Sequence, residues 1–113
     1  MQEAALAVAS FAHGRTMQTL RSDDILRSAI YYKFVIIGEA LSKLRQRDQA
    51  TAESISEHAR IVGFRNQIIH GYGMVDHVTT WRIIETKIPI FIRELGHLLD
   101  SRRGGENEPA CRP

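Results

Sequence analysis

Residues 23–47 read DDILRSAIYYKFVIIGEALSKLRQR, and this stretch decides the fold. Large apolar side chains recur in it every three or four residues, which is the period of one face of an α-helix. The stripe extends over more than four turns, and Val35 and Ile36 widen it. We therefore expect a helix from Asp23 to about Arg47, with one side in the core. The residues of the stripe are Leu26, Ile30, Phe34, Ile37, Leu41 and Leu44.

Shorter helical patterns flank this stretch on both sides. Residues 3–13 are rich in alanine and stop before Gly14, and residues 57–70 stop before a Gly-Tyr-Gly turn. Glycine just after the last turn often ends a helix, so each pattern predicts one helix. Residues 45–56 are polar, and we expect a loop or a short helix there. The large apolar residues of the two flanking patterns are Leu6, Val8, Phe11, Ile61, Phe64 and Ile68.

A last long pattern follows a helix cap at Asp76 or Thr79. Pro89 lies inside it, and a proline in a helix interior removes one hydrogen bond and costs ~3 kcal/mol, so we expect a kink. Residues 102–113 are rich in glycine, proline and charge and predict a disordered tail after a helical domain at residues 1–101. The apolar stripe of this pattern consists of Val78, Trp81, Ile84, Ile88, Phe91, Leu95 and Leu98.

Four principal helices, each apolar along one side and joined by short connections, predict an all-α fold. The simplest arrangement is an up-and-down four-helix bundle, with a short extra helix or loop between the second and third helices. The 113 residues, 43% of them hydrophobic, suit a single domain. We find no run of ~18 apolar residues and no export signal, and Cys111 has no second cysteine to pair with. We therefore expect a cytoplasmic protein that does not contact a membrane.

The most site-like stretch of the sequence is Arg65-Asn66-Gln67-Ile68-Ile69-His70-Gly71-Tyr72. In an ideal helix Asn66 and His70 share a face, while Arg65 lies about 140° around the helix from His70. One helix therefore does not aim all three side chains at one point. They could converge at the helix end, where Gly71 frees the backbone, or across the seam of a symmetric dimer.

These residue types favour cleavage of RNA by its own 2′-hydroxyl. A histidine such as His70 can accept the hydroxyl proton or protonate the leaving oxygen, and the guanidinium of Arg65 can stabilise the extra charge on the five-coordinate phosphate. Asn66 can bond to a phosphate oxygen or orient the imidazole. No metal or other cofactor is required. DNA is not a substrate for this chemistry because it lacks the nucleophile.

Each of these side chains also has an ordinary structural interpretation. His70 fits a histidine at the core edge, Arg65 a surface cation paired with Glu57 or Asp76, and Tyr72 an aromatic lid with a solvated hydroxyl. A helix–turn–helix DNA reader is disfavoured, because no helix surface beyond the motif is rich in exposed Arg, Asn and Gln. A metal site is disfavoured because the histidines are irregularly spaced and lack carboxylate pairs. The histidines that could suggest a metal are His58, His70, His77 and His97.

The pattern Arg-x4-His-x-Tyr, with asparagine directly after the arginine, resembles the signature of HEPN-domain proteins. More closely, it resembles the HepT toxins of prokaryotic HepT/MntA toxin–antitoxin pairs. Residues 37–40, Ile-Gly-Glu-Ala, match a family stretch upstream, and Val-Gly-Phe at 62–64 leads into Arg65 as in the family. The similarity covers about residues 11–99. The chain departs from it at residues 56–58, Ser-Glu-His, because many relatives carry a tryptophan shortly before the motif.

The resemblance implies a homodimer of helical bundles that acts as a metal-independent ribonuclease, with the sites of both subunits facing a shared cleft. By position, Arg65 and His70 match the catalytic pair and Asn66 the polar helper. Tyr72 matches the tyrosine to which an MntA-like nucleotidyltransferase antitoxin attaches AMP, which would block the cleft and repel RNA phosphates. Glu39 has two interpretations, an acid hydrogen-bonded within the bundle or a residue that lines the cleft and positions Arg65.

Two classes of function remain open at this point. One is an endoribonuclease toxin of a type VII-like toxin–antitoxin pair, silenced by AMPylation of Tyr72. The other is a non-catalytic subunit that binds a nucleotide or substrate for its nucleotidyltransferase. The intact set of Arg65, Asn66, His70 and Tyr72 favours the enzyme, because a binding module does not need a general base beside a guanidinium.

Overall fold

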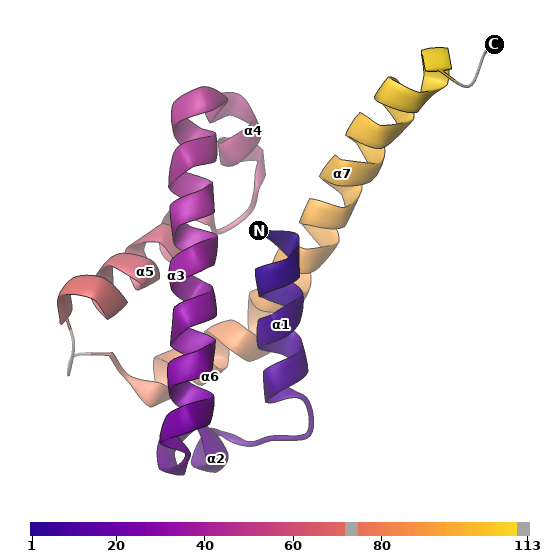
Figure 1. Ribbon diagram of the computed structural model, residues 1–113. Helices are drawn as coiled ribbons and strands as arrows, with labels where there is room; N and C mark the ends of the chain where they lie inside the picture. The colour runs from indigo at the N-terminus through magenta and orange to yellow at the C-terminus, as the bar shows by residue number, and fades with distance from the viewer. Residues whose placement is uncertain (72–74, 111–113) are drawn as a thin grey trace.

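The computed structural model describes residues 1–71 and 75–110, with side chains as far as residue 101. Within these ranges the chain is helical almost throughout and contains no strand, which confirms the all-α prediction. Figure 1 shows α1 beside α3, α5 crossing α3, and α7 leaving the body of the protein at an angle. The helices are α1 (Gln2–Ala12), α2 (Met17–Ser22), α3 (Asp24–Arg47), α4 (Gln49–Ser54), α5 (His58–Gly71), α6 (His77–Thr86) and α7 (Ile88–Ala110).

The long helix α3 forms the centre of the core, as its sequence predicts. Asp23 caps it, and the carboxylate Oδ1 accepts a hydrogen bond of 3.0 Å from the backbone N–H of Leu26. Helices α1, α2, α4 and α5 pack against α3. Leu44, near the C-terminal end of the stripe, is only partly buried. The other five residues of the predicted stripe are buried: Leu26, Ile30, Phe34, Ile37 and Leu41.

Helix α1 packs mainly through small side chains. Its buried residues are Ala4, Ala5, Val8 and Ala12, whereas Leu6 is 47% exposed. The distance between two packed helices depends on the side chains at their contact, so alanines allow a close approach. Helix α1 consequently contacts α3, α6 and α7.

Two six-residue helices connect the long ones. Helix α4 confirms the prediction of a short element in the polar segment, and Asp48 caps it by accepting a hydrogen bond of 3.1 Å from the backbone N–H of Thr51. Helix α2 was not predicted, because it is too short for a periodic stripe and buries only Leu20. Thr16 caps α2 through a bond of 3.3 Å from the backbone N–H of Thr19.

The last apolar pattern forms two helices instead of the single kinked helix that the sequence predicts. Helix α6 ends at Thr86, the cap residue Lys87 follows, and α7 begins at Ile88. Pro89 is therefore the second residue of a helix and not an interior one. The first N–H groups of a helix lack an intrahelical partner, so a proline costs little there. Figure 1 shows that the chain changes direction between α6 and α7.

Helix α7 extends to Ala110, whereas the sequence predicts a disordered tail from residue 102 onward. Once packing fixes the start of a helix, each added residue contributes one hydrogen bond, so the helix can continue into a polar segment. Cys111 and the two residues after it lie outside the described residues. Within residues 1–71 and 75–110, no helix is long and apolar enough to cross a membrane.

Candidate active site

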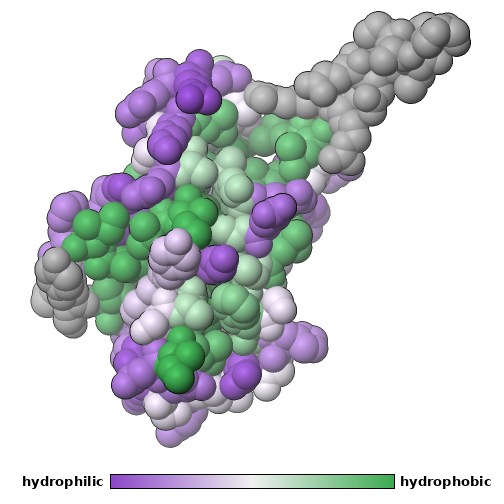
Figure 2. Space-filling view, in the orientation of Figure 1, coloured by the Kyte–Doolittle hydropathy of each residue, from purple (hydrophilic) through white to green (hydrophobic). Residues whose placement is uncertain are grey.

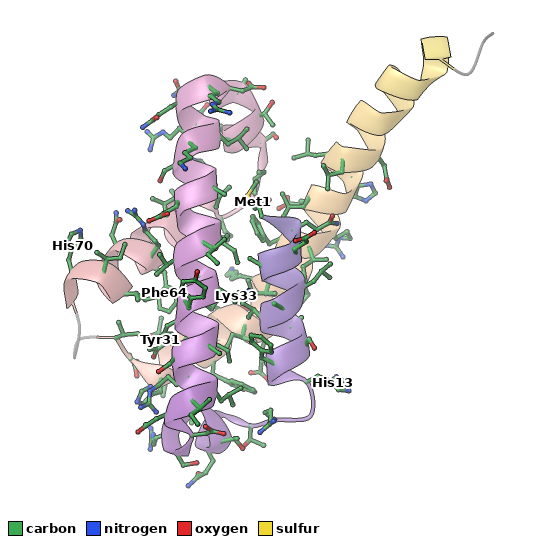
Figure 3. The ribbon with its side chains drawn as sticks, viewed as in Figure 1. Met1, His13, Tyr31, Lys33, Phe64 and His70 are labelled. Carbon is green, nitrogen blue, oxygen red and sulfur yellow. The ribbon has the colours of Figure 1, made fainter. Side chains whose placement is uncertain are left out.

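Two aromatic contacts determine how α5 rests on α3. The rings of Phe34 and Phe64 have centres 4.9 Å apart and an interplanar angle of 85°. Tyr31 and Phe64 form a second edge-to-face pair, with ring centres 6.4 Å apart. Figure 3 labels Phe64 and Tyr31 at this crossing of the two helices. Because Arg65 directly follows Phe64, the crossing also fixes the position of Arg65.

Gly38 lets Arg65 lie directly on α3. Gly38 is buried, and a Cβ atom added to it would lie 2.4 Å from Cβ and 2.6 Å from Cγ of Arg65. Such distances are far inside van der Waals contact, so a side chain at position 38 would push the two helices apart. In the sequence, Gly38 stands out only as part of the Ile-Gly-Glu-Ala stretch of the family resemblance. A glycine in the middle of a strong apolar stripe was the signal that could have revealed this role.

Arg65 is held by an acid and an amide. Its Nη2 atom donates a hydrogen bond of 3.4 Å to Oε1 of Glu39 on α3, and its Nη1 atom donates one of 2.7 Å to Oδ1 of Asn66. The Arg65 side chain is 24% exposed. Its Nε atom is buried and has no hydrogen-bond partner among the described residues. The guanidinium is thus fixed at the α3–α5 seam with its outer end near the surface, as required of a residue that binds a phosphate.

Glu39 therefore touches Arg65, and this contact is compatible with both of its predicted interpretations. The Glu39 side chain is 51% exposed, so the ion pair contributes little to stability and mainly orients the guanidinium. The alternative partners proposed for Arg65 are not used. Glu57 instead pairs with Arg60 and Lys87, and Asp76 caps α6.

His70 lies near the end of α5 and is exposed to solvent. Figure 3 shows it at the outer end of the helix, away from α3. Asn66, one turn earlier on the same face, is exposed as well. Within the described part of this chain, no hydrogen bond or ion pair joins His70 to Arg65. The imidazole is accessible to a substrate, and it diverges from the guanidinium as the helical geometry predicts.

The structure thus brings Glu39, Arg65 and Asn66 together and leaves His70 on the same helix but apart from them. Tyr72, the predicted modification site, lies outside the described residues. Among the residues that the structure does describe, no group of three His, Cys, Asp or Glu side chains is placed to hold a metal ion.

A family model described as Ribonuclease HepT-like matches residues 1–98. The chain belongs to the HepT-like ribonuclease family. This membership supports a ribonuclease kind of activity, and the matched range contains Gly38, Glu39, Arg65, Asn66 and His70. No curated protein and no solved structure gave a match.

In this HepT-like chain, the segment that precedes the motif is anchored by polar contacts. The Glu94 carboxylate on α7 accepts hydrogen bonds from the backbone N–H and the hydroxyl of Ser56, at 3.1 Å and 2.6 Å. Glu57 has a positive φ of 64° and pairs with Lys87 at 3.3 Å and with Arg60 at 2.9 Å. The hydrogen bond from Lys87 is the main reason why the pKa of Glu57 is lowered. These contacts fix the start of α5.

The start of α6 in this HepT-like chain is fixed by Asp76. Its carboxylate accepts hydrogen bonds of 3.0 Å from the backbone N–H of Val78 and 3.0 Å from the hydroxyl of Thr79, and these bonds lower the pKa of Asp76. Behind them, the buried Thr80 donates to the Asp76 carbonyl at 2.9 Å. Of the two caps predicted from the sequence, Asp76 and Thr79, the structure confirms Asp76.

Proposed function

We propose that this protein is a metal-independent endoribonuclease toxin, with Arg65, Asn66 and His70 as its catalytic residues. The observation that carries the proposal is the guanidinium of Arg65, which is held by Glu39 and Asn66 at the helix seam, on the same helix as the exposed imidazole of His70. Membership of the HepT-like ribonuclease family supports the same class of reaction. The substrate is RNA in the cytoplasm. DNA is refused because it has no 2′-hydroxyl.

The proposed reaction needs only groups that this chain supplies. The imidazole of His70 accepts the proton of the 2′-hydroxyl, and the freed oxygen attacks the adjacent phosphorus. The bond from phosphorus to the 5′-oxygen then breaks, and a protonated imidazole donates a proton to that oxygen. The products are a 2′,3′-cyclic phosphate and a 5′-hydroxyl end. Arg65 stabilises the charge that builds up on the phosphate oxygens, and Asn66 holds one of those oxygens or the imidazole.

The proposed active form is a homodimer. In one chain, the side chains of Arg65 and His70 leave α5 about 140° apart, so a second copy is needed to bring an imidazole to a guanidinium. The surface of α3 next to the site supports this arrangement. Tyr32, two turns before Glu39 on the same helix face, is 63% exposed, and exposed aromatic residues are frequent in interfaces.

Complementation between inactive variants tests the shared site. Arg65→Ala and His70→Ala are each expected to be inactive, and mixing them under conditions that exchange subunits should restore cleavage, because one of the two sites in a mixed dimer keeps both residues. A mixture that stays inactive although mass spectrometry shows mixed dimers would contradict a site shared between subunits. Two wild-type subunits exchanged in the same way provide the positive control.

The catalytic assignment itself is tested by incubating the purified protein with RNA in excess chelator. Wild type should cleave the RNA, and Arg65→Ala and His70→Ala should each lower the rate by about a hundredfold or more. Arg47→Ala, which removes an exposed cation from the end of α3, is the matched control. Cleavage that survives loss of His70 would disprove the assignment. Absence of cleavage by unmodified wild type would instead support the second candidate, a nucleotide-binding partner of a nucleotidyltransferase.

We further propose that Tyr72 is the off switch of the enzyme. An MntA-like nucleotidyltransferase antitoxin would transfer AMP from ATP to the tyrosine oxygen and release pyrophosphate. The added phosphodiester is bulky and anionic and lies two residues from His70 in the sequence, so it would repel an RNA phosphate. Intact mass after co-expression with the nucleotidyltransferase should reveal AMP increments that disappear in Tyr72→Phe. Increments retained in that variant would place the modification elsewhere.

A further inference from the structure

A hollow of about 400 Å³ lies beside the proposed site, where the end of α3 meets α4 and α5. This volume is within the range that suits a small ligand or one unit of a polymer. Figure 2 shows hydrophilic side chains gathered over this end of α3 and α4. The hollow is lined by Ser42, Arg45, Gln46, Gln49 and Val62.

The hollow continues the seam on which Arg65 is held. Ser42 follows Gly38 by one helical turn on α3, and Val62 precedes Arg65 by about one turn on α5. Arg45 lies seven residues beyond Gly38, which is about 10 Å along the helix axis. A nucleic-acid strand bound at Arg65 therefore reaches the hollow within a few nucleotides.

The lining suits the phosphate and the base of a nucleotide. The guanidinium of Arg45 suits a phosphate, the amides of Gln46 and Gln49 suit the hydrogen-bonding edges of a base, and the aliphatic Val62 suits the face of a base. None of the lining residues is acidic. The nearest carboxylate in the sequence, Asp48, accepts hydrogen bonds from the backbone N–H and the hydroxyl of Thr51 at the start of α4.

Arg45 is available for a ligand. It is exposed, and it takes part in no ion pair within the described residues. A cation near the C-terminus of a helix also has a structural use, because it complements the helix dipole. Arg47 is equally exposed, also lies in the last turn of α3 and does not line the hollow. The two arginines therefore separate a ligand-binding role from a purely structural one.

We propose that the hollow is a nucleotide subsite, which binds a phosphate and base of the RNA a few nucleotides from the bond that is cleaved at Arg65 and His70. The subsite rests on the proposed ribonuclease function. It extends that function by assigning Arg45, Gln46 and Gln49 to substrate binding outside the catalytic residues.

The test compares Arg45→Gln with the matched control Arg47→Gln on two substrates, a single-stranded RNA oligomer and a dinucleotide too short to reach the hollow. With the oligomer, Arg45→Gln should raise KM about tenfold and leave kcat unchanged, because a charge-assisted contact to phosphate is lost. The slope of a plot of log KM against log salt concentration should decrease by about 0.7. The dinucleotide should be cleaved equally by wild type and both variants.

Three results would overturn the subsite. Equal KM values for the two variants would show that general charge matters and not the hollow. Loss of dinucleotide cleavage in Arg45→Gln would mean that the substitution damages the catalytic site. Unchanged RNA kinetics combined with weaker binding of the nucleotidyltransferase would make the hollow a protein-docking surface.

A direct binding measurement separates failure of the subsite from failure of the proposed function. Fluorescence anisotropy with a labelled RNA oligomer reports affinity without cleavage. If wild type does not cleave RNA at all, the ribonuclease proposal fails, and the affinities of Arg45→Gln and Arg47→Gln still decide whether the hollow binds a nucleotide. Equal affinities in that assay would reject the subsite as well.

Discussion

Replacing Gly38 by alanine should damage stability and activity together, because Arg65 lies directly on this glycine. The new Cβ would be 2.4 Å from Cβ of Arg65. The separation must increase by about 1 Å to reach 3.4 Å, the lower limit of ordinary van der Waals contact. The Cβ atom of Arg65 cannot rotate away, so α5 itself has to move. That movement carries the guanidinium with it.

The expected magnitudes follow from this displacement. Overpacking of a tight contact costs about 1–3 kcal/mol, and the higher helix propensity of alanine returns about 0.5–1 kcal/mol, so the net destabilisation is up to about 2.5 kcal/mol. A displacement of about 1 Å at a catalytic group lowers the rate by roughly a hundredfold. Urea unfolding followed by circular dichroism measures the first effect, and RNA cleavage in chelator measures the second.

Gly63→Ala is the matched control for this prediction. Gly63 lies on α5, is exposed, and has open space where a Cβ would be placed. The same substitution there should stabilise the protein by about 0.5–1 kcal/mol and leave cleavage unchanged. The reasoning is refuted if Gly38→Ala and Gly63→Ala have the same stability and the same cleavage rate. A destabilised Gly38→Ala that cleaves normally would show that the close approach does not position Arg65.

Four other substitutions address separate parts of the structure. Glu39→Gln should slow cleavage but change the free energy of unfolding by less than about 1 kcal/mol, because the pair with Arg65 is exposed; an unaltered rate would contradict a positioning role. Phe34→Ala removes a fully buried ring and should cost about 3–5 kcal/mol in urea unfolding, and a loss below about 1 kcal/mol would mean that the aromatic contact does not hold α5. Asp76 has a folded-state pKa below its ordinary 3.8, so its contribution to stability is complete above that pH and is lost as the pH falls through the lowered value. Asp76→Asn keeps the cap and should show a smaller acid-induced drop in the urea midpoint than wild type; an equal drop in the two proteins would contradict this role of Asp76. Pro89→Ala should change stability by well under the ~3 kcal/mol of an interior proline, and a large gain in helix stability would argue that the break at Lys87 is caused by the proline alone.

The sequence predicts the elements whose signal is periodic. The stripe on α3 identifies five buried residues of that helix, and the helix cap at Asp76 is found where a short polar side chain precedes an apolar pattern. The helix propensity of alanine likewise reveals α1. Its packing face is less evident, because Ala4, Ala5 and Ala12 make the contact while the larger Leu6 is exposed.

The features that the sequence does not reveal depend on contacts between distant residues. Gly38 and Arg65 lie on different helices and are 27 positions apart in the sequence, so no local pattern encodes their close approach. The sequence predicts a kink at Pro89 and not the helix break at Lys87, because the apolar stripe continues across both residues and conceals the helix end. The sequence offers Glu39, Glu57 and Asp76 as neighbours of Arg65, and the choice of Glu39 follows from the direction in which α5 crosses α3.

Helix α5 has a mechanical property that follows from its attachment. Ser56 and Glu57, just before the helix, bind to α7 and to the cap residue between α6 and α7, while His70 is near the far end of the helix. Arg65 and His70 lie seven and twelve residues from the first residue of the helix, about 10 Å and 18 Å along its axis. The packing of Phe64 and Arg65 on α3 holds the middle of the helix as well. A tilt of the part beyond Arg65 would therefore move the imidazole while the guanidinium stays in place.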